Sequence, residues 1–233
     1  MKIIGFSLNN IRLWENSDNK ADLIKYVQQL NIGGIEIAFC CKELETTKFT
    51  EEQINWIKSL DYVSIHYPTK SKQENSLELL GKIKYFYDLL NAKAVIMHPD
   101  VLPEPEVLEK LDMAFCVENL RRGFSINQLK KIFKKYPKLG FCLDVAHAMC
   151  WSEKETSRLI EAFKDKLVQV HFSASNLETD HISASDASDS FFRSIQPLKG
   201  IDVPIIIETF FEKKDINAAK KEIEFVKNYM DLT

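Results

Sequence analysis

The residues in this sequence that could do chemistry lie at the ends of short apolar runs. Six runs end in a histidine or an acid: His66, His98, Glu118, Asp144, His171 and Glu208. The two other histidines are His147, three residues after Asp144, and His181. Imidazole and carboxylate together suit zinc, manganese and similar cations, whereas calcium and magnesium prefer oxygen alone. Because these acids would be costly to desolvate together without a cation, the pattern predicts a divalent-metal site.

Side chains so distant in sequence meet only if the fold brings the ends of the runs together. The runs are continuous rather than alternating, which is typical of parallel strands buried on both faces. Eight of them occur, at residues 3–8, 35–39, 62–66, 94–98, 114–118, 140–144, 167–171 and 204–208. Amphipathic segments separate the runs, and three pairs have the spacing of a helix-starting capping box: Thr50 with Gln53, Ser125 with Gln128, and Ser152 with Glu155.

Eight strands with helices between them, and no Gly-, Pro- or Ser-rich linker, predict an α/β fold. We expect a single (β/α)8 TIM barrel domain over residues 1–233, with only a short helix in residues 101–111. The strand ends then share one face, where the six residues converge. An open doubly wound sheet is the alternative, but no strand is followed by a Gly-rich phosphate loop, and the chain has only seven glycines.

Composition limits the partners and the compartment. The formal net charge of −3 gives no basic surplus for binding duplex nucleic acid, and the lysines at 130, 131, 134 and 135 have the spacing of a solvated helix face. The five cysteines lack metal-finger spacing and are expected to be reduced thiols. The first run is too short for a signal peptide, and no stretch approaches membrane-spanning length. We therefore expect a cytoplasmic protein without a membrane partner; no protein partner is evident.

Six segments, in this order and spacing, resemble the xylose isomerase-like TIM barrel superfamily, and within it the endonuclease IV branch (AP endonuclease family 2). They are "SIHYP", "VIMHP", "CVENL", "CLDVAHA", "VQVHFS" and "IIIET". The resemblance covers nearly the whole chain and implies up to three divalent ions, with zinc as the first choice and manganese or magnesium as alternatives. It implies one ion on His66, His98 and Glu118, a second on Glu118, Asp144, His171 and Glu208, and a third on His147, His181 and one further acid.

The sequence departs from the family pattern around the third ion. The family places an aspartate two residues before the last histidine, whereas this chain has Thr179, so Asp180 is assigned as the replacement ligand and Glu178 is the alternative. The usual glycine after His-Pro is Asp100, and residues 183–188 are SASDAS instead of glycine-rich. The segment after the second run, "CCKELETTKFT", lacks the arginine expected of a protein that opens duplex DNA.

Two enzyme classes and one non-enzymatic class fit these residues. In a phosphoester hydrolase, acting on damaged DNA or a small phosphorylated substrate, close metal ions lower the pKa of a water. This hypothesis is favoured because His66 and His98 supply more ligands than a single-metal site needs. In a sugar or sugar-phosphate isomerase or epimerase, one metal polarises a carbonyl while Glu118 and Glu208, the catalytic residues in either case, move a proton. A binding module with a vestigial metal site is the third possibility.

Three residues beside the strand ends are assigned to substrate binding: Tyr67, Asn119 and Arg121. Arg121, like Arg122, has the chemistry to meet phosphate oxygens, although an exposed loop pair explains both equally well. Tyr67, Phe172 and Trp151 fit the wall of a sugar pocket, although packing explains each of them. Glu36, in "GGIEIAF", is either a partner of a metal ligand or part of a salt bridge inside the barrel.

Overall fold

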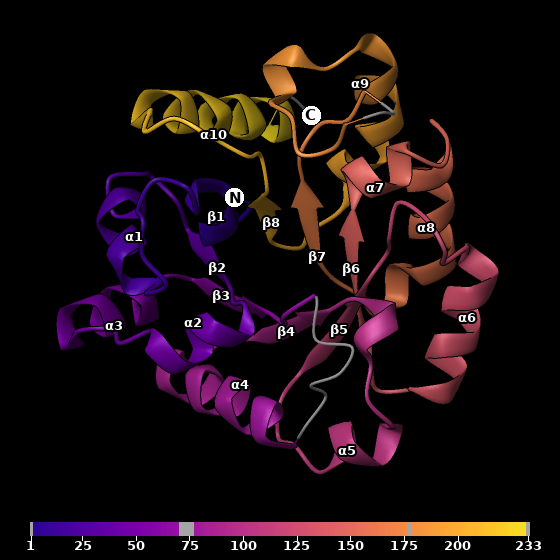
Figure 1. Cartoon of the computed structure of the whole chain (residues 1–233). Helices are drawn as coiled ribbons and strands as arrows, with labels where there is room; N and C mark the ends of the chain where they lie inside the picture. Colours follow the sequence, from indigo (N-terminus) through magenta and orange to yellow (C-terminus); the bar gives the residue numbers. More distant parts are fainter. Residues whose placement is uncertain (1, 70–76, 177–178, 232–233) are drawn as a thin grey trace.

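The computed structural model describes residues 2–69, 77–176 and 179–231. Within these residues eight parallel strands form a closed barrel, and each strand pairs with its neighbours in sequence order (Figure 1). The strands are β1 (Ile4–Ser7), β2 (Gly34–Ala38), β3 (Tyr62–His66), β4 (Ala94–Met97), β5 (Phe115–Glu118), β6 (Gly140–Asp144), β7 (Leu167–Phe172) and β8 (Ile205–Ile207). All eight predicted runs overlap a strand, so the predicted TIM barrel is confirmed. The domain boundaries 1–233 stay a prediction.

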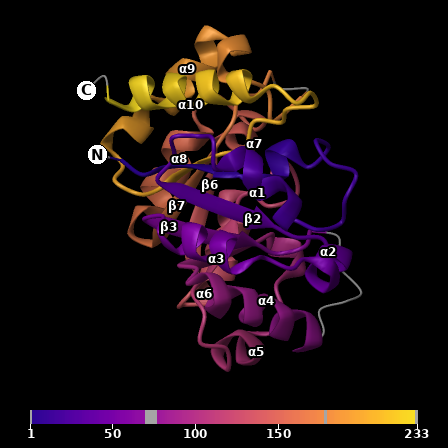
Figure 2. The ribbon, with the colours of Figure 1, turned by 90° about the vertical axis from the view of Figure 1, so that its left-hand side faces the viewer.

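The helices lie outside the barrel, in the segments that follow the strands (Figures 1 and 2). They are α1 (Ala21–Val27), α2 (Cys41–Thr46), α3 (Glu51–Lys58), α4 (Leu77–Leu90), α5 (Pro105–Glu109), α6 (Ile126–Lys135), α7 (Val145–Met149), α8 (Glu155–Phe163), α9 (Asp189–Ile195) and α10 (Ile216–Asp231). Short 3-10 helices are η1 (Leu8–Ile11), η2 (Pro99–Val101), η3 (Lys164–Lys166), η4 (Ala184–Asp186) and η5 (Gln196–Gly200). As expected, only the short α5 follows β4 in residues 101–111.

Two of the three predicted capping boxes start helices. Thr50 caps α3 together with Gln53, and Ser125 caps α6 together with Gln128. The third prediction is wrong, because α8 begins after Lys154 without a side-chain cap. A turn precedes the helix there: the Glu155 amide donates to the carbonyl of Ser152, and the Ser152 hydroxyl has no hydrogen-bond partner among the described residues.

The barrel interior changes from apolar to polar along its axis. Alternate residues of a strand face the same side, so Tyr62, Ser64 and His66 of β3 all point inward. One end is filled by a small buried cluster: Tyr62, Ala94, Ile96, Cys116, Cys142 and Ile206. Toward the carboxyl end of the strands, the buried interior positions are polar, including Glu36 of β2 and Gln169 of β7. The polar residues therefore occupy the carboxyl end of the strands, where the sequence predicts a site.

The cysteines and the lysines of α6 have the states that the sequence predicts. All five cysteines are free, and Cys116 and Cys142 are buried. The four clustered lysines of α6 are exposed, as a solvated helix face requires. Among the described residues, no helix is both long enough and apolar enough to cross a membrane.

The close approach of β1 and β2 gives a test of the barrel's packing. A Cβ atom on Gly5 would lie 2.9 Å from the backbone of Gly34 and 2.5 Å from Ile206 Cδ1. Gly5→Ala is therefore expected to lower the free energy of unfolding by about 1–3 kcal/mol. Gly81→Ala in α4 is the control, since nothing lies within 4 Å of its Cβ position, and it is expected to stabilise by about 0.5–1 kcal/mol. Urea unfolding measures the stability of both variants. A Gly5→Ala variant with the same urea midpoint as the wild-type protein would contradict the close packing of β1 against β2.

Candidate metal centre

The structure brings together eight of the nine residues that the sequence assigns to metal binding. Their ligand atoms form three groups, and within each group these atoms lie within 4.8 Å of one another. The groups are His66, His98 and Glu118; Glu118, Asp144, His171 and Glu208; and Asp144, His147 and His181. Glu118 and Asp144 each belong to two groups, so the three groups form one continuous cluster. The ninth residue, Asp180, lies outside them.

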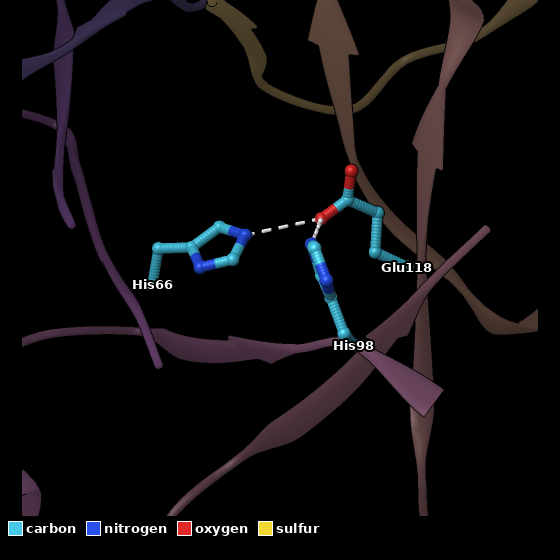
Figure 3. Close-up of side chains that lie close together, drawn as sticks. All are labelled: His66, His98 and Glu118. Atoms are coloured by element: carbon cyan, nitrogen blue, oxygen red, sulfur yellow. Dashed lines mark hydrogen bonds and ion pairs between the residues drawn. The ribbon is translucent and has the colours of Figure 1, made fainter. Parts of the chain in front are cut away.

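Glu118 is at the centre of the cluster and is 1% exposed. Its Oε2 lies 3.1 Å from His66 Nε2 and 3.4 Å from His98 Nε2 (Figure 3). Its Oε1 lies 3.3 Å from His147 Nδ1 and 3.4 Å from His171 Nδ1. Glu118 thus belongs to two groups of candidate ligands, with His66 and His98 at Oε2 and His171 at Oε1, an arrangement suited to bridging two cations.

Backbone carbonyls orient two of the imidazoles. His66 Nδ1 lies 2.9 Å from the carbonyl oxygen of Tyr67, which leaves its Nε2 facing Glu118. His147 Nδ1 lies 3.0 Å from the carbonyl oxygen of Asn119, which leaves its Nε2 as the ligand atom. Metal-binding histidines commonly donate their other ring N–H to such an acceptor, because this fixes both the tautomer and the ring orientation.

His171 is oriented by a buried carboxylate inside the barrel. Its Nε2 lies 3.1 Å from Glu36 Oε2, and neither side chain is exposed. The same oxygen accepts hydrogen bonds from Ser64 Oγ at 2.9 Å and Gln169 Nε2 at 2.8 Å. His171 Nδ1 then faces Glu208, 3.3 Å away. Of the two interpretations left open by the sequence, Glu36 is therefore the partner of a candidate ligand.

Two buried atoms of the cluster have no hydrogen-bond partner in the part of the chain that the structure describes. They are Asp144 Oδ2 and His171 Nδ1. The other oxygen of Asp144 accepts from the backbone amide of His147 at 2.7 Å, which fixes the carboxylate. Buried polar atoms are rarely left unpaired, and both of these are atoms of the kinds that bind metal ions. The residues present therefore fit a divalent cation.

The third group depends on the loop that follows β7. His181 has φ +58, in the left-handed region that non-glycine residues seldom adopt, and its Nδ1 lies 3.2 Å from Ser173 Oγ. Asp180 lies 3.8 Å from His147 Nε2 but forms an ion pair of 2.9 Å with Arg121. The alternative acid, Glu178, lies outside the described residues.

A buried glutamate of α10 ties this loop to the end of β8. Glu222 is 3% exposed and accepts hydrogen bonds from Ser183 Oγ and the Ala184 amide. Its Oε1 also accepts from Thr209 Oγ1 at 2.8 Å, next to Glu208. One carboxylate thus holds the chain beside two candidate ligands, His181 and Glu208.

The electrostatics of the cluster favour protonated imidazoles wherever a cation is missing. Burial alone would lower the pKa of His66, but its hydrogen bond to Glu118 and nearby carboxylates raise it to about 9. Burial likewise opposes the charge on His147, yet Asp144 and Glu118 raise its pKa to about 10. Burial, with neighbouring carboxylates, raises the pKa of Glu208 to about 8. The imidazolium charges thus offset the buried acids.

A cavity of about 670 Å³ opens over the cluster and is lined by His66, His98, Glu118, His147, His181 and Glu208. Asp144 and His171 are fully buried beneath them. Of the three predicted substrate-binding residues, Tyr67 lines this cavity, whereas Asn119 and Arg121 do not.

The other predicted substrate-binding residues make contacts within the protein. Asn119 is buried, and its side-chain amide both donates to and accepts from the backbone of Asp144, each at 2.8 Å. Phe172 is in the core, and Trp151 donates to the carbonyl of Leu120. A role of any of them in binding substrate stays a prediction.

Sequence reasoning missed two cations in the cavity wall, Arg12 and Lys20. Both lie in the segment between β1 and β2, away from any strand end, so no pattern in the sequence marks them.

A family model described as the xylose isomerase-like TIM barrel matches residues 104–229. The chain belongs to this family of barrels. No curated protein matches it. Among solved structures it is similar to D-allulose 3-epimerase from Methylomonas sp., with a TM-score of 0.71 and 15% identity over 98% of this chain and 97% of that chain. It is also similar to endonuclease IV from Thermus thermophilus, with a TM-score of 0.67 and 16% identity over 99% and 100% of the two chains. At these identities the similarity shows the fold alone.

The raised pKa values predict how metal binding depends on pH. Below about pH 9, His66 and His147 of the metal-depleted protein carry protons that a cation must displace. Zinc binding at pH 7.5 is therefore expected to release at least two protons, because Glu208, whose pKa is raised to about 8, is partly protonated as well, and the apparent affinity rises as the pH rises toward 9. Calorimetry in buffers of different ionisation enthalpy measures the released protons. Zinc binding without proton release would contradict these protonation states.

The contact between Glu36 and His171 predicts a change in metal affinity. Glu36→Gln removes the carboxylate behind the imidazole and is expected to weaken zinc binding about 10–100-fold. Competition with a chromophoric chelator measures the affinity. Glu155→Gln is the matched control, because Glu155 is a similarly buried acid whose ion pair is with Arg158 on the outer helix α8. Equal affinities in both variants would mean that Glu36 does not support the ligand.

Proposed function

We propose that this protein is a hydrolase of phosphoesters that uses at least two divalent cations, with zinc as the first choice. The observation that carries the proposal is the position of Glu118, which belongs to two groups of candidate ligands: its Oε2 faces His66 and His98, and its Oε1 faces His171. A carboxylate shared by two groups of candidate ligands suits a site where two cations lie close together, as in two-metal hydrolytic sites, whereas a single cation would use only one of these groups.

The protein's own residues would hold and orient the reacting groups. When bound, paired cations lower the pKa of a water and neutralise the charge that develops on phosphoryl oxygens. His66, His98 and Glu118 would hold one cation, and Glu118, Asp144, His171 and Glu208 would hold the other. Glu118 and Glu208, the proposed catalytic residues, both line the cavity and thus reach the substrate. The third group, on Asp144, His147 and His181, adds a further cation position; Asp180 is drawn toward Arg121.

The substrate we propose is a small phosphorylated molecule rather than damaged DNA. The cavity of about 670 Å³ is of the size that holds a small ligand. The formal net charge of −3 offers no basic surplus for a duplex, and the segment after β2 has no arginine to insert into one.

A sugar or sugar-phosphate isomerase or epimerase is the second candidate. The observation that favours it is the group of Glu118, Asp144, His171 and Glu208, which by itself supplies four candidate ligands for one cation such as manganese or magnesium and leaves positions for a substrate. In this function Glu118 and Glu208 would move a proton at the carbon next to a carbonyl.

We also propose a cytoplasmic location, since five free cysteines suit a reducing compartment.

The two candidate functions differ in their need for His98. His98 belongs only to the group on the Oε2 side of Glu118. His98→Gln is therefore expected to lower phosphoester turnover at least about a hundredfold, while a single-metal isomerase would keep most of its activity. The assays are release of nitrophenol from nitrophenyl phosphomonoesters and diesters, and exchange of ketose hydrogens in D₂O followed by NMR.

Glu155→Gln, outside the cavity, serves as the control in both assays. Hydrogen exchange without any phosphoester cleavage, with the cations restored, would replace the hydrolase by the isomerase. Full phosphoester activity in the His98→Gln variant would show that the cation position formed by His66, His98 and Glu118 is not needed for the reaction.

A further inference from the structure

The cavity above the metal centre extends to a second wall, formed by residues that follow β1 and β2. This wall includes Arg12 and Lys20 from the β1–α1 segment and Glu43 from α2. The same cavity is lined by the acids and imidazoles already described. One cavity therefore contains both candidate ligands for cations and two fixed cations, Arg12 and Lys20.

Arg12 is held in place by weak contacts that leave its charge available. Its guanidinium carbon lies 5.0 Å from the ring centroid of Phe210, and Nη1 donates to Asn9 Oδ1 at 3.4 Å. Among the described residues, no carboxylate forms an ion pair with Arg12. Phe210 in turn donates its backbone amide to the carbonyl of His181 at 2.9 Å, which ties this wall to the metal centre.

Lys20 is a buried cation, only 3% exposed, that also lines the cavity. Its ammonium forms an ion pair of 3.0 Å with Glu43 Oε1. Glu43 Oε2 accepts from the backbone amide of Cys40 at 2.7 Å, so the pair is anchored to the start of α2. A charge this deeply buried is costly unless it is paired. The charges of Lys20 and Glu43 therefore cancel each other, and Arg12 supplies the net positive charge of the wall.

Arg121, the arginine that the sequence points to for phosphate, does not compete for this role. Its guanidinium is bound to Asp180 at 2.9 Å, and it does not line the cavity. A guanidinium presents a planar set of N–H donors that matches the oxygens of a carboxylate or a phosphate. Arg12 presents such donors to the cavity.

We propose that the wall formed by Arg12, Asn9 and the Lys20–Glu43 pair is a subsite for an anionic group, either phosphate or carboxylate, that the substrate carries in addition to the group that meets the cations. The inference rests on the proposed function for the position of the reacting group. It narrows the substrate class to small molecules with two polar ends, one that meets the cations and one that meets Arg12.

The test measures binding of probes that cannot be hydrolysed, so it does not depend on turnover. The probes are butylphosphonate, which has one anionic end, 4-phosphonobutyrate, which adds a carboxylate, and butane-1,4-bisphosphonate, which adds a second phosphonate. Each series is repeated with one methylene fewer and one more, to cover the span of the cavity. Calorimetry on the zinc-restored protein gives the affinities.

The wild-type protein is expected to bind at least one two-ended probe about tenfold more tightly than the matching alkylphosphonate. The preferred end, carboxylate or phosphonate, identifies the anion. Arg12→Gln is expected to abolish the preference. Arg158→Gln, which removes an exposed arginine of α8 outside the cavity, is expected to keep it.

Equal affinity for one-ended and two-ended probes in the wild type, or no binding of any probe, would overturn the subsite. An unchanged preference in a folded Arg12→Gln protein would overturn it as well. A preference for two-ended probes without phosphoester cleavage would support the anion subsite and contradict the proposed hydrolase activity. Phosphoester cleavage without that preference would support the hydrolase activity and contradict the subsite.

Discussion

A carboxylate that is 1% exposed, as Glu118 is, must be neutralised by groups that the fold brings to it, because an isolated buried charge costs several kcal/mol. Glu118 lies at the carboxyl end of β5, and the imidazoles that surround it come from β3, the end of β4, α7 and β7. Only a closed barrel with these strands in register places all of them within reach of one carboxylate. The barrel and the cluster are therefore mutually dependent.

The polar cluster also changes the interior of the barrel below it. An interior of large aliphatic residues is usual in such barrels. Here Glu36, Ser64 and Gln169 lie behind His171, and Tyr62 donates to Gln169 Oε1 at 2.8 Å. Most polar atoms of this network have partners within it, although Glu36 Oε1 has none among the described residues. The apolar cluster fills the other end of the barrel. One ordered network thus replaces part of the hydrophobic core and fixes the orientation of a single imidazole.

The barrel could be predicted from the sequence because two local signals coincide at the strand ends. A continuous apolar run shows a buried strand, and a histidine or acid at its end marks the polar rim. The partner of Glu36 could not be predicted, because only the register of β2 with β3 and the closure of the barrel toward β7 decide it. The contacts of the loop residues could not be predicted from the sequence for a related reason. Arg121 is paired with Asp180, and Arg12 is placed by Phe210, through contacts between distant segments that no local periodicity encodes.

Whether this barrel offers ligands for one metal ion or for several depends on a few residues at the carboxyl ends of its strands. The group of Glu118, Asp144, His171 and Glu208 comes from four consecutive strands, β5 to β8, and is sufficient for one cation. His66 and His98, on the neighbouring β3 and at the end of β4, add ligands on the unused oxygen of Glu118 without altering that group. The same scaffold therefore offers candidate ligands for one cation or for more than one, and the residues at the ends of β3 and β4 determine whether Glu118 belongs to one group of candidate ligands or to two.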